Sequence, residues 1–497
     1  MLAITHARIC SSIKADPVLI EVHSSAGVPS FALVGMAETA VKESRERVRS
    51  AIVNAGFEFP WRHLVVNLSP ADIPKTGSGY DLAIAIGLLM VSGQLSLANS
   101  DTFEFYGELG LSGQLNAVAG LLPALIKGRD AGKTLIIPSS NQADAAWIAD
   151  ANVYLANSLH DVVSFLKQNK SLMQAEPLAP EPLKPIVDWQ DVKGQLDVKQ
   201  SLLYAAAGGH SALMIGPPGC GKTMLVKAFM SILPPLSESQ SLDSAVIHSI
   251  AQQPTQTLNQ RIPPMRSPHH TCSEIAIIGG GSKALPGEVS LAHNGVLFLD
   301  ELLEFSRAAL EGLREPLENG EIHITRARAK AVYPAKFQLL CAMNPCPCGH
   351  YGHPRCQCSP EVVKRYMSKL SGPLLDRIDL HIEVQPISPS TLLNNNCPME
   401  PNSHDWRQRI AKCHYTQYQR QGKLNSQLNP RELESLKFIQ PKVQKHLLAA
   451  IEQLGLSARA LHRIMRLLIT IADWHQMPID NSLVAEAISL RSLDRSP

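Results

Sequence analysis

The sequence predicts an α/β protein of about three domains, and three observations support this prediction. At 497 residues the chain is too long for one hydrophobic core, because domains usually hold roughly 100 to 200 residues. A proline-rich stretch, QAEPLAPEPLKP at 174–185, favours an extended spacer. The chain beyond residue 400 is rich in Leu, Gln and Arg and has few strand signals. We therefore expect an α+β domain at 1–165, a linker at 166–186, an α/β domain at 187–390 and a helical domain at 391–497.

The amino-terminal domain combines strand and helix patterns. Two apolar runs bounded by turn residues, HLVVNLS at 63–69 and KTLIIPSS at 133–140, predict buried strands. Two longer apolar segments, YDLAIAIGLLMVSG at 80–93 and AGLLPALIKGRDAG at 119–132, predict helices that stop at glycine. The pattern is that of a mixed α and β domain.

Composition narrows the setting of the protein. The longest apolar run, LAIAIGLLMV at 82–91, is about half the roughly 20 residues that a membrane-spanning helix needs, so no membrane partner is expected. The start of the chain, MLAITHARICSSIKADP, lacks the pattern of a secretory signal. We expect a cytoplasmic protein, whose thiols stay reduced. The net charge of +2 neither requires nor excludes nucleic acid.

Residues 211–229, SALMIGPPGCGKTMLVKAF, predict a strand, a glycine-rich turn and a helix in succession. The turn fits the phosphate-loop template G-x-x-x-x-G-K-[ST]. Glycines let backbone N–H groups wrap around phosphates, and the helix N-terminus adds positive potential. Lys222 is expected to reach the β and γ phosphates, and the Thr223 hydroxyl to bind magnesium. The expected nucleotide-binding residues are Gly216, Pro217, Pro218, Gly219, Cys220, Gly221, Lys222 and Thr223.

A second apolar strand, within NGVLFLDELLEF at 294–305, ends in two carboxylates, Asp300 and Glu301. Alone, this pattern is equally typical of a helix start, where acidic side chains meet a favourable dipole. Together with a phosphate loop, it predicts that Asp300 orients Mg²⁺ and that Glu301 positions and activates the attacking water. The two motifs together predict an ATP hydrolase that uses ATP and Mg²⁺.

Two further polar residues lie at strand ends. The strand KFQLLCAMN at 336–344 ends in Asn344, whose amide is a candidate sensor of the γ phosphate. The segment GPLLDRIDLHIEV at 372–384 carries Arg377 between acidic residues. Arg377 is either half of a surface ion pair or a finger that completes a neighbouring subunit's site.

The run CAMNPCPCGHYGHPRCQCSP at 341–360 holds a cysteine-rich insert at 345–360. Four thiolates are enough for a tetrahedral zinc site, although C-x-C is tighter than the usual spacing. The alternative is that the thiols are reduced and simply pack in a loop. The candidate zinc ligands are Cys346, Cys348, Cys356 and Cys358, with His350 and His353 as spares.

Residues 318–337, ENGEIHITRARAKAVYPAKF, predict a hairpin with a basic face. From residue 322 the pattern alternates, so that Arg326, Arg328 and Lys330 fall on one side of a strand. Such a row of cations can follow a phosphate backbone. It can also be a solubilising edge strand that charge protects from aggregation.

The motifs GPPGCGKT, GVLFLDEL, AMNPCPCG and GPLLDRIDL occur in an order that resembles the AAA+ ATPases of the magnesium-chelatase-like ComM (YifB) family. The similarity extends over essentially the whole chain, including DWQDVKGQ before the phosphate loop. It implies a central AAA+ P-loop domain with a carboxy-terminal helical lid, assembled as a hexameric ring with ATP between subunits.

The resemblance also implies roles for single residues. Asn344 matches the sensor position, and Arg377 matches the finger that acts in trans. Arg459, in LSARALHRIMRLL, matches a second sensor on the lid. Without the family, Arg459 fits a solvated helix face that it shares with Arg463 and Arg466. The basic hairpin is implied to face the pore of the ring.

The family implies a DNA motor, a helicase or branch-migration enzyme that acts on recombination intermediates in natural transformation. Single-stranded or branched DNA is then the partner. The alternative is a chelatase-type motor that remodels a protein for metal insertion into a porphyrin. The chelatase ATPase resembles the core but lacks a Lon-like front domain, so residues 1–165 favour the DNA motor.

The segment DIPKTGSGYDLAIAIGLL is similar to the proteolytic domain of Lon proteases, whose chemistry needs a serine activated by a lysine. By position, that serine falls on Gly79 and that lysine on Leu122. Ser78 and Lys75 do not replace them, so protease activity is not expected. The domain is instead expected to serve as a platform for binding or assembly. The preceding helix carries Lys42, Arg45, Arg47 and Arg49, which either touch DNA or form a solvated face.

Overall fold

The computed structural model describes residues 1–35, 39–72, 75, 77–148, 151–177, 187–281, 284–325, 330–352, 354–387, 401–435, 440–491 and 493. The chain divides into two compact units. Unit 1 comprises Met1–Glu181, Leu242–Gln260 and Ala331–Tyr333, and unit 2 comprises Pro182–Ser241, Arg261–Lys330 and Pro334–Pro497. Residues 242–260, which fall inside the expected central domain at 187–390, belong to unit 1 in this division. In the described part of the chain, no helix is long and apolar enough to cross a membrane.

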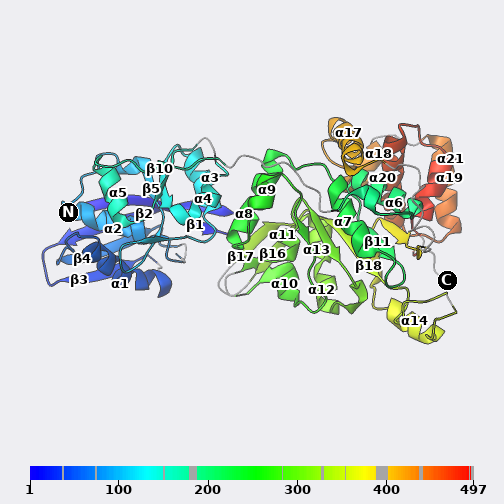
Figure 1. Ribbon diagram of the computed structural model, residues 1–497, viewed down its shortest axis with the longest axis horizontal. Helices are drawn as coiled ribbons and strands as arrows, with labels where there is room; N and C mark the ends of the chain where they lie inside the picture. The colour runs from blue at the N-terminus through cyan, green and yellow to red at the C-terminus, as the bar shows by residue number, and fades with distance from the viewer. Residues whose placement is uncertain are drawn as a thin grey trace. The chain divides into compact units, whose positions relative to one another are not determined.

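The first sheet of unit 1 has the strand order β1-β2-β4-β3 (Figure 1). Along most of β2, buried and exposed side chains alternate, as expected when one face of a sheet covers a core. Helix α2 is buried at almost every position and packs against β1 and β2. The predicted strand at 63–69 and helix at 80–93 are confirmed. The bounds are β1 Leu2–Ser11, β2 Lys14–Ser25, β3 Ser30–Val34, α1 Thr39–Asn54, β4 His63–Ser69 and α2 Asp81–Val91.

The second sheet of unit 1 has the order β10-β9-β8-β5. The predicted strand at 133–140 and helix at 119–132 are confirmed as β8 and α3. The expected linker at 166–186 was too long, because Met173 and Gln174 form β10 and pair antiparallel with β9. Their backbone hydrogen bonds belong to the sheet, so the spacer begins later. The bounds are β5 Phe103–Phe105, α3 Leu122–Asp130, β8 Thr134–Pro138, β9 Val153–Ala156, α5 Leu159–Leu166 and β10 Met173–Gln174.

Unit 2 is built on a five-stranded parallel sheet with the order β12-β15-β18-β11-β19. The strands β11, β15 and β18 are almost wholly buried, which explains their continuous apolar sequences. The carboxyl ends of parallel strands share one edge of a sheet, where open α/β sheets bind ligands. The bounds are α6 Leu196–Gly208, β11 Ala212–Ile215, α7 Lys222–Ile232, β12 Met265–Arg266, β15 Val296–Leu299, β18 Gln338–Met343 and β19 Leu380–Glu383.

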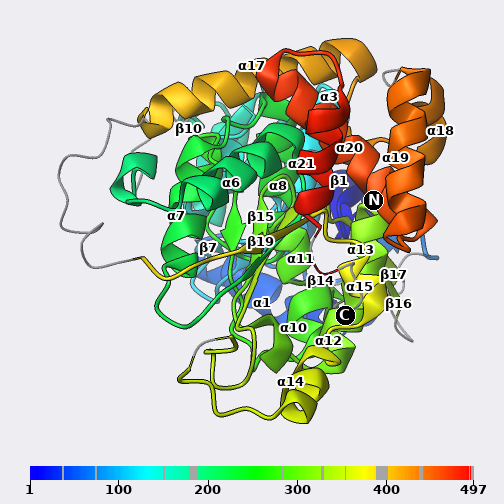
Figure 2. The same ribbon diagram turned by 90° about the vertical axis from the view of Figure 1, so that its right-hand side faces the viewer.

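The predicted helical region beyond residue 400 is confirmed and appears in orange and red in Figure 2. Helix α17 packs against α6 and α7, and α20 packs against α6 and α21. An apolar stripe on α20, which includes Ile464, Leu467 and Leu468, is buried in the core of unit 2. The bounds are α17 Ser403–Gln421, α18 Pro430–Ser435, α19 Pro441–Gln453, α20 Ala458–His475 and α21 Asn481–Ser489.

Shorter elements connect the larger ones. They are β6 Glu108–Leu109, β7 Leu115–Asn116, α4 Gln142–Ala145, α8 Glu238–Ile250, α9 Gln256–Asn259, α10 Glu274–Ile278, β13 Gly279–Gly280, β14 Leu285–Pro286, α11 Glu288–Leu291, α12 Arg307–Gly312, α13 Arg314–Asn319, β16 Glu321–Thr325, β17 Lys330–Pro334, α14 Pro360–Met367 and α15 Gly372–Leu375. The predicted basic hairpin is present as the two-stranded sheet β16-β17.

A buried ionic network joins the lid helix α20 to the parallel sheet. Asp379, which directly precedes β19, is 1% exposed. One of its oxygens accepts from Arg463 at 2.9 Å, and the other lies 3.0 Å from Nδ1 of His210. The remaining ring nitrogen of His210 lies 2.7 Å from the hydroxyl of Thr470, on α20. Two side chains of α20 are thereby tied to residues at the ends of α6 and β19.

Candidate active site

The phosphate loop joins the end of β11 to the start of α7. Gly219 and Gly221 have φ of 78° and 90°, in the left-handed region that glycine adopts without strain. A Cβ at either position would meet nothing within 4 Å, so this part of the loop is open. A Cβ at Gly216, by contrast, would clash with the carbonyl oxygen of Val384. The loop is therefore packed at its first glycine and open where phosphates are expected to bind.

Lys222 and Asn344 meet beside this loop. The Nζ of Lys222 donates to the carbonyl oxygens of Gly216 at 2.7 Å and Pro217 at 3.0 Å. It also donates to Oδ1 of Asn344 at 3.2 Å. Asn344 directly follows β18, the strand next to β11 in the sheet. Sheet order thus brings together two residues that are 122 positions apart in sequence.

Thr223 and Asp300 form the second contact of the site. The Thr223 hydroxyl donates to Oδ2 of Asp300 at 2.9 Å. A hydroxyl and a carboxylate oxygen are ligands that Mg²⁺ accepts, so the donor set fits this ion. Asp300 follows β15, and its other oxygen accepts from the backbone N–H of Glu301 at 2.9 Å. The positions predicted for metal binding therefore lie together.

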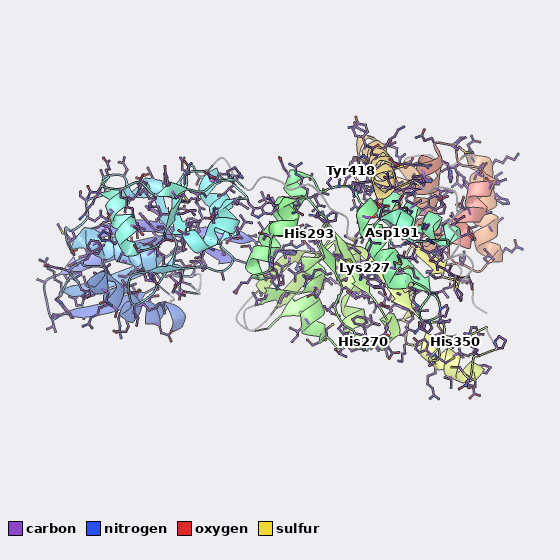
Figure 3. All side chains as sticks on the ribbon, viewed as in Figure 1. Asp191, Lys227, His270, His293, His350 and Tyr418 are labelled. Atoms are coloured by element: carbon purple, nitrogen blue, oxygen red, sulfur yellow. The ribbon has the colours of Figure 1, made fainter. Side chains whose placement is uncertain are left out.

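Glu301 has a strained backbone and an unforeseen partner. Its φ of 52° is in the left-handed region, which costs a residue with a side chain of order 1 kcal/mol or more. Its carboxylate lies 2.9 Å from Nδ1 of His270. Figure 3 labels His270 near the lower edge of unit 2. The sequence RSPHHTCSE did not indicate this role, because nothing local links residue 270 to residue 301.

Gln195 is a second residue whose role the sequence did not reveal. It lies in the DWQDVKGQ segment before α6. Its amide nitrogen donates to the carbonyl oxygens of Cys220 at 2.9 Å and Gln385 at 3.0 Å. Its amide oxygen is buried and accepts no hydrogen bond from any described residue. An unpaired buried acceptor beside a phosphate loop suits a ligand that carries a donor.

The two predicted arginines have other partners than the residues described above. Arg377 is 7% exposed, donates to the carbonyl oxygen of Pro373 at 2.6 Å and pairs with the carboxylate of Glu318. Arg459 on α20 is exposed and lies 3.8 Å from the carboxylate of Asp376. Its neighbour Arg463 binds Asp379, so the interpretation of this helix side as a uniformly solvated face is wrong. That interpretation used helical spacing alone.

Of the three basic residues predicted on the hairpin, only Lys330 is among the described residues. Arg326 and Arg328 lie outside the described residues. Lys330 opens β17 and is exposed, while Ala331 and Tyr333 are buried. The expectation that one strand from residue 322 carries Arg326, Arg328 and Lys330 on one side is wrong for Lys330, because β16 ends at Thr325 and its even-numbered residues, Ile322 and Ile324, are buried.

The amino-terminal unit gives its candidate residues local partners. Ser78 donates to the carboxylate of Glu108, and Lys75 donates to the carbonyl oxygen of Pro70. On α1, Arg47 forms an ion pair with buried Asp81 at 2.8 Å. The interpretation of α1 as a wholly solvated basic face is therefore wrong for Arg47. The side chain of Lys42 lies outside the described residues.

The four predicted zinc ligands form one cluster after β18. The Sγ atoms of Cys346, Cys348, Cys356 and Cys358 all lie within 4.8 Å of one another. Backbone N–H groups of His350 and Gln357, together with the thiol of Cys346, lower the pKa of Cys348 to about 6. Figure 3 labels His350 in the yellow region near α14, whereas His353 lies outside the described residues.

Three family models match successive parts of the chain. Residues 188–392 match the model described as magnesium chelatase, subunit ChlI. Residues 400–491 match the model of the ChlI C-terminal region, and residues 20–141 match one described as subunit ChlI of Mg-chelatase. The last match gives the amino-terminal unit a chelatase description, so the expected Lon likeness receives no support from it. It also removes the argument that this unit disfavours a chelatase-type protein.

Two of the relatives match along almost the whole chain, and a third matches part of it. Protein YifB of Salmonella typhimurium is 44% identical over 497 residues, which cover 99% of this chain and 98% of that protein. Competence protein ComM of Haemophilus influenzae is 43% identical over 500 residues, with the same coverage of each chain. The magnesium-chelatase subunit ChlI of Euglena gracilis is 24% identical over 188 residues, which cover 33% of this chain and 53% of that protein.

Proposed function

The chain belongs to the ComM/YifB family of magnesium-chelatase-like proteins, and from this membership we propose that it is an AAA+ ATPase that acts as a motor on DNA. One observation carries the ATPase proposal. The phosphate loop, Asn344 and Asp300 meet at the carboxyl edge of the parallel sheet, through the contacts of Lys222 and Thr223. This edge is where open α/β sheets bind their ligands.

The residues of the chain divide the work of hydrolysis. Lys222 exchanges its hydrogen bonds to carbonyl oxygens for contacts with the phosphates of ATP. The side chain of Asn344, which accepts from Lys222, senses the γ phosphate. Thr223 and Asp300 would hold Mg²⁺, which would supply positive charge to the phosphate oxygens. Glu301 orients the attacking water once its carboxylate turns from His270. His270 is then a positioning residue for Glu301.

The adenine base is proposed to meet Gln195. Two carbonyl oxygens fix the amide nitrogen of Gln195, so its oxygen is presented as a hydrogen-bond acceptor. The 6-amino group of adenine is a donor, whereas guanine carries an acceptor at the same place. A site built around a polar contact discriminates strongly against an analogue that lacks it.

Replacing Gln195 by Ala is expected to weaken ATP binding by roughly 3- to 10-fold, the value of one hydrogen bond. The ratio of the affinity for ATP to the affinity for GTP is expected to fall as well. Titration of fluorescent ATP and GTP analogues measures both effects. Gln190→Ala is the matched control, because Gln190 is exposed and lies in the same segment. If Q195A binds both nucleotides as the unmodified protein does, Gln195 is not at the base.

DNA is the proposed substrate of the motor. The relative from H. influenzae is named a competence protein, which supports a role in handling DNA during natural transformation. Exposed Lys330, at the start of β17, supports a basic hairpin that contacts a phosphate backbone. As a helicase or branch-migration enzyme in a hexameric ring, the protein would use Arg377 of one subunit in the ATP site of the next. Arg377 must then exchange Glu318 for ATP when the ring assembles.

A non-hydrolysable ATP analogue is expected to strengthen binding to single-stranded or forked DNA about 5-fold or more, a typical coupling between two sites. Fluorescence anisotropy with labelled DNA measures this effect. Combined charge reversal of Arg326, Arg328 and Lys330 is expected to weaken DNA binding and to flatten its salt dependence. The control reverses three exposed basic residues elsewhere, Arg431, Lys442 and Lys445. Absence of a DNA complex at low salt rules out the DNA motor.

A chelatase-type motor is the second candidate, because three family models of chelatase subunit ChlI match most of the chain. Such a motor would remodel a protein partner and would hydrolyse ATP without regard to DNA. Comparing ATP turnover with forked DNA, with unfolded protein and with neither addition separates the two functions. ATP turnover that rises with forked DNA but not with unfolded protein supports the DNA motor.

A further inference from the structure

The four clustered cysteines have the spacing of ligands around one metal ion. In a tetrahedral zinc–thiolate site, Zn–S bonds of about 2.3 Å place the sulfurs roughly 3.8 Å apart. The Sγ atom of Cys356 lies 3.9 Å from that of Cys346 and 3.7 Å from that of Cys348, and the last two are 3.3 Å apart. A disulfide needs sulfurs about 2.05 Å apart, so none of these pairs is bonded.

Backbone N–H groups face the sulfur atoms of the cluster. N–H groups of His350 and Gln357 point at the sulfur of Cys348, and the N–H of Cys358 points at that of Cys356. The carbonyl oxygen of Cys346 closes a turn by accepting from Gly349 at 2.9 Å. Main-chain contacts therefore help to hold the sulfurs of the two C-x-C pairs together in one cluster.

The insert has little else to hold it together. Among the described residues of 345–360, only Cys346 and Gly349 are buried, and the aromatic side chain of Tyr351 is 61% exposed. A loop without an apolar core needs other interactions to offset the conformational entropy that it loses on folding. Binding of a structural metal ion supplies folding energy directly.

The tip of this loop rests against the phosphate loop. Gly349 has a φ of 79°, and a Cβ there would clash with Cδ of Pro218 and lie 3.1 Å from its Cγ. On its other side the insert continues from Asn344, which accepts a hydrogen bond from Lys222. The insert thus meets the nucleotide site at two residues. It contacts Pro218, and it directly follows Asn344 in the chain.

We propose that Cys346, Cys348, Cys356 and Cys358 bind one Zn²⁺ and that the loop held by this ion supports the phosphate loop through the contact of Gly349 with Pro218. Zinc occupancy then sets how well the chain binds nucleotide. The second half of this statement rests on the proposed ATPase function, whereas zinc binding itself does not.

Metal analysis of the full chain, purified without a histidine tag, is expected to give about one zinc per chain. The double variant Cys348→Ser/Cys356→Ser is expected to lose it, whereas Cys10→Ala, a control cysteine in unit 1, keeps it. Lys222→Ala is expected to keep its zinc while failing to bind nucleotide, which separates failure of the ATP site from failure of the zinc site. Protein free of zinc, or one with the absorption of an iron–sulfur cluster, overturns the zinc assignment.

The support of the phosphate loop is tested by two glycines with the same backbone conformation. Gly349 and Gly352 have φ of 79° and 82°, so alanine strains the backbone equally at both. Only at Gly349 does the new methyl group meet Pro218, because a Cβ at Gly352 has nothing within 4 Å. Gly349→Ala is expected to weaken binding of a fluorescent ATP analogue about 10-fold or more, whereas Gly352→Ala stays near the unmodified protein. Equal affinities of the two variants, with zinc retained, overturn the proposed support.

Discussion

Lys222→Ala is expected to reduce ATP turnover by roughly 100- to 1,000-fold, the cost of removing one group that stabilises transition-state charge. Lys222 is buried at the end of the phosphate loop and holds three oxygen acceptors, which include the Asn344 side chain. Alanine removes both the charge that binds phosphates and the bridge to the neighbouring strand. Steady-state ATPase assays and titration with an ATP analogue are both expected to show the loss.

Lys227→Ala is the matched control for this variant, since Lys227 is exposed on the same helix (Figure 3). Glu301→Gln provides the complementary control. It keeps the shape of the side chain and removes its charge, so nucleotide binding is expected to persist while hydrolysis falls by roughly 100-fold or more. Turnover retained by K222A means that the nucleotide site lies elsewhere.

The sequence was sufficient for the parts of the site that depend on neighbouring residues. A buried strand, a glycine-rich turn and a helix follow one another within 211–229, and β15 ends directly before Asp300. Their meeting follows from parallel strand ends sharing one edge. The cysteine cluster was predictable for a related reason, because all four cysteines lie within 13 residues of one another, from 346 to 358.

Contacts between distant segments were not predictable where at least one partner lies away from the carboxyl end of a parallel strand. Gln195 is fixed by the backbone of residue 385, and His270 reaches Glu301 only because the chain after β12 runs beside β15. Arg463 was expected on a solvated face, since helical spacing gives the side of a helix but not what covers it. Its carboxylate partner, Asp379, lies 84 residues earlier in the chain.

Asp379→Asn is expected to lower the free energy of unfolding of unit 2 by about 3 to 5 kcal/mol, because it leaves the charge of Arg463 unpaired in a buried place. Asp379 is 1% exposed, and the Arg463 side chain is 18% exposed. Differential scanning calorimetry of the full chain measures the loss. Asp405→Asn, an exposed acid in the first turn of α17, is the control and is expected to change stability by less than about 1 kcal/mol.

A second variant distinguishes a lost ion pair from general damage to the core. Arg463→Met removes the positive charge of this pair, and the double variant Asp379→Asn/Arg463→Met removes both of its charges. Its destabilisation is therefore expected to fall short of the sum of the two single effects by about 1 kcal/mol or more. Strict additivity would mean that the two side chains do not stabilise each other.

The pH dependence of stability separates Asp379 from two histidines of unit 2. Burial alone would raise the pKa of Asp379, but the charge of Arg463 and the hydrogen bond from His210 outweigh it and hold the pKa well below its usual range. An unfolded aspartate has a pKa of about 3.9, so this contribution is full above about pH 4 and is lost as the pH falls further.

The two histidines act at higher pH. Burial, with the nearby charge of Lys336, lowers the pKa of His293 to about 4, and burial, with the charge of Arg491, lowers that of His381 to about 3. An unfolded histidine takes up a proton near pH 6.5, before either folded one does, so stability falls as the pH drops from about 6.5 towards 4. In calorimetry across pH, D379N is expected to reduce the loss below pH 4, to which Glu432 and Asp480 also contribute through their lowered pKa values, and to keep the loss between pH 6.5 and 4. If D379N also lost the fall in stability between pH 6.5 and 4, that fall would belong to Asp379. This result would contradict the role given to the two histidines.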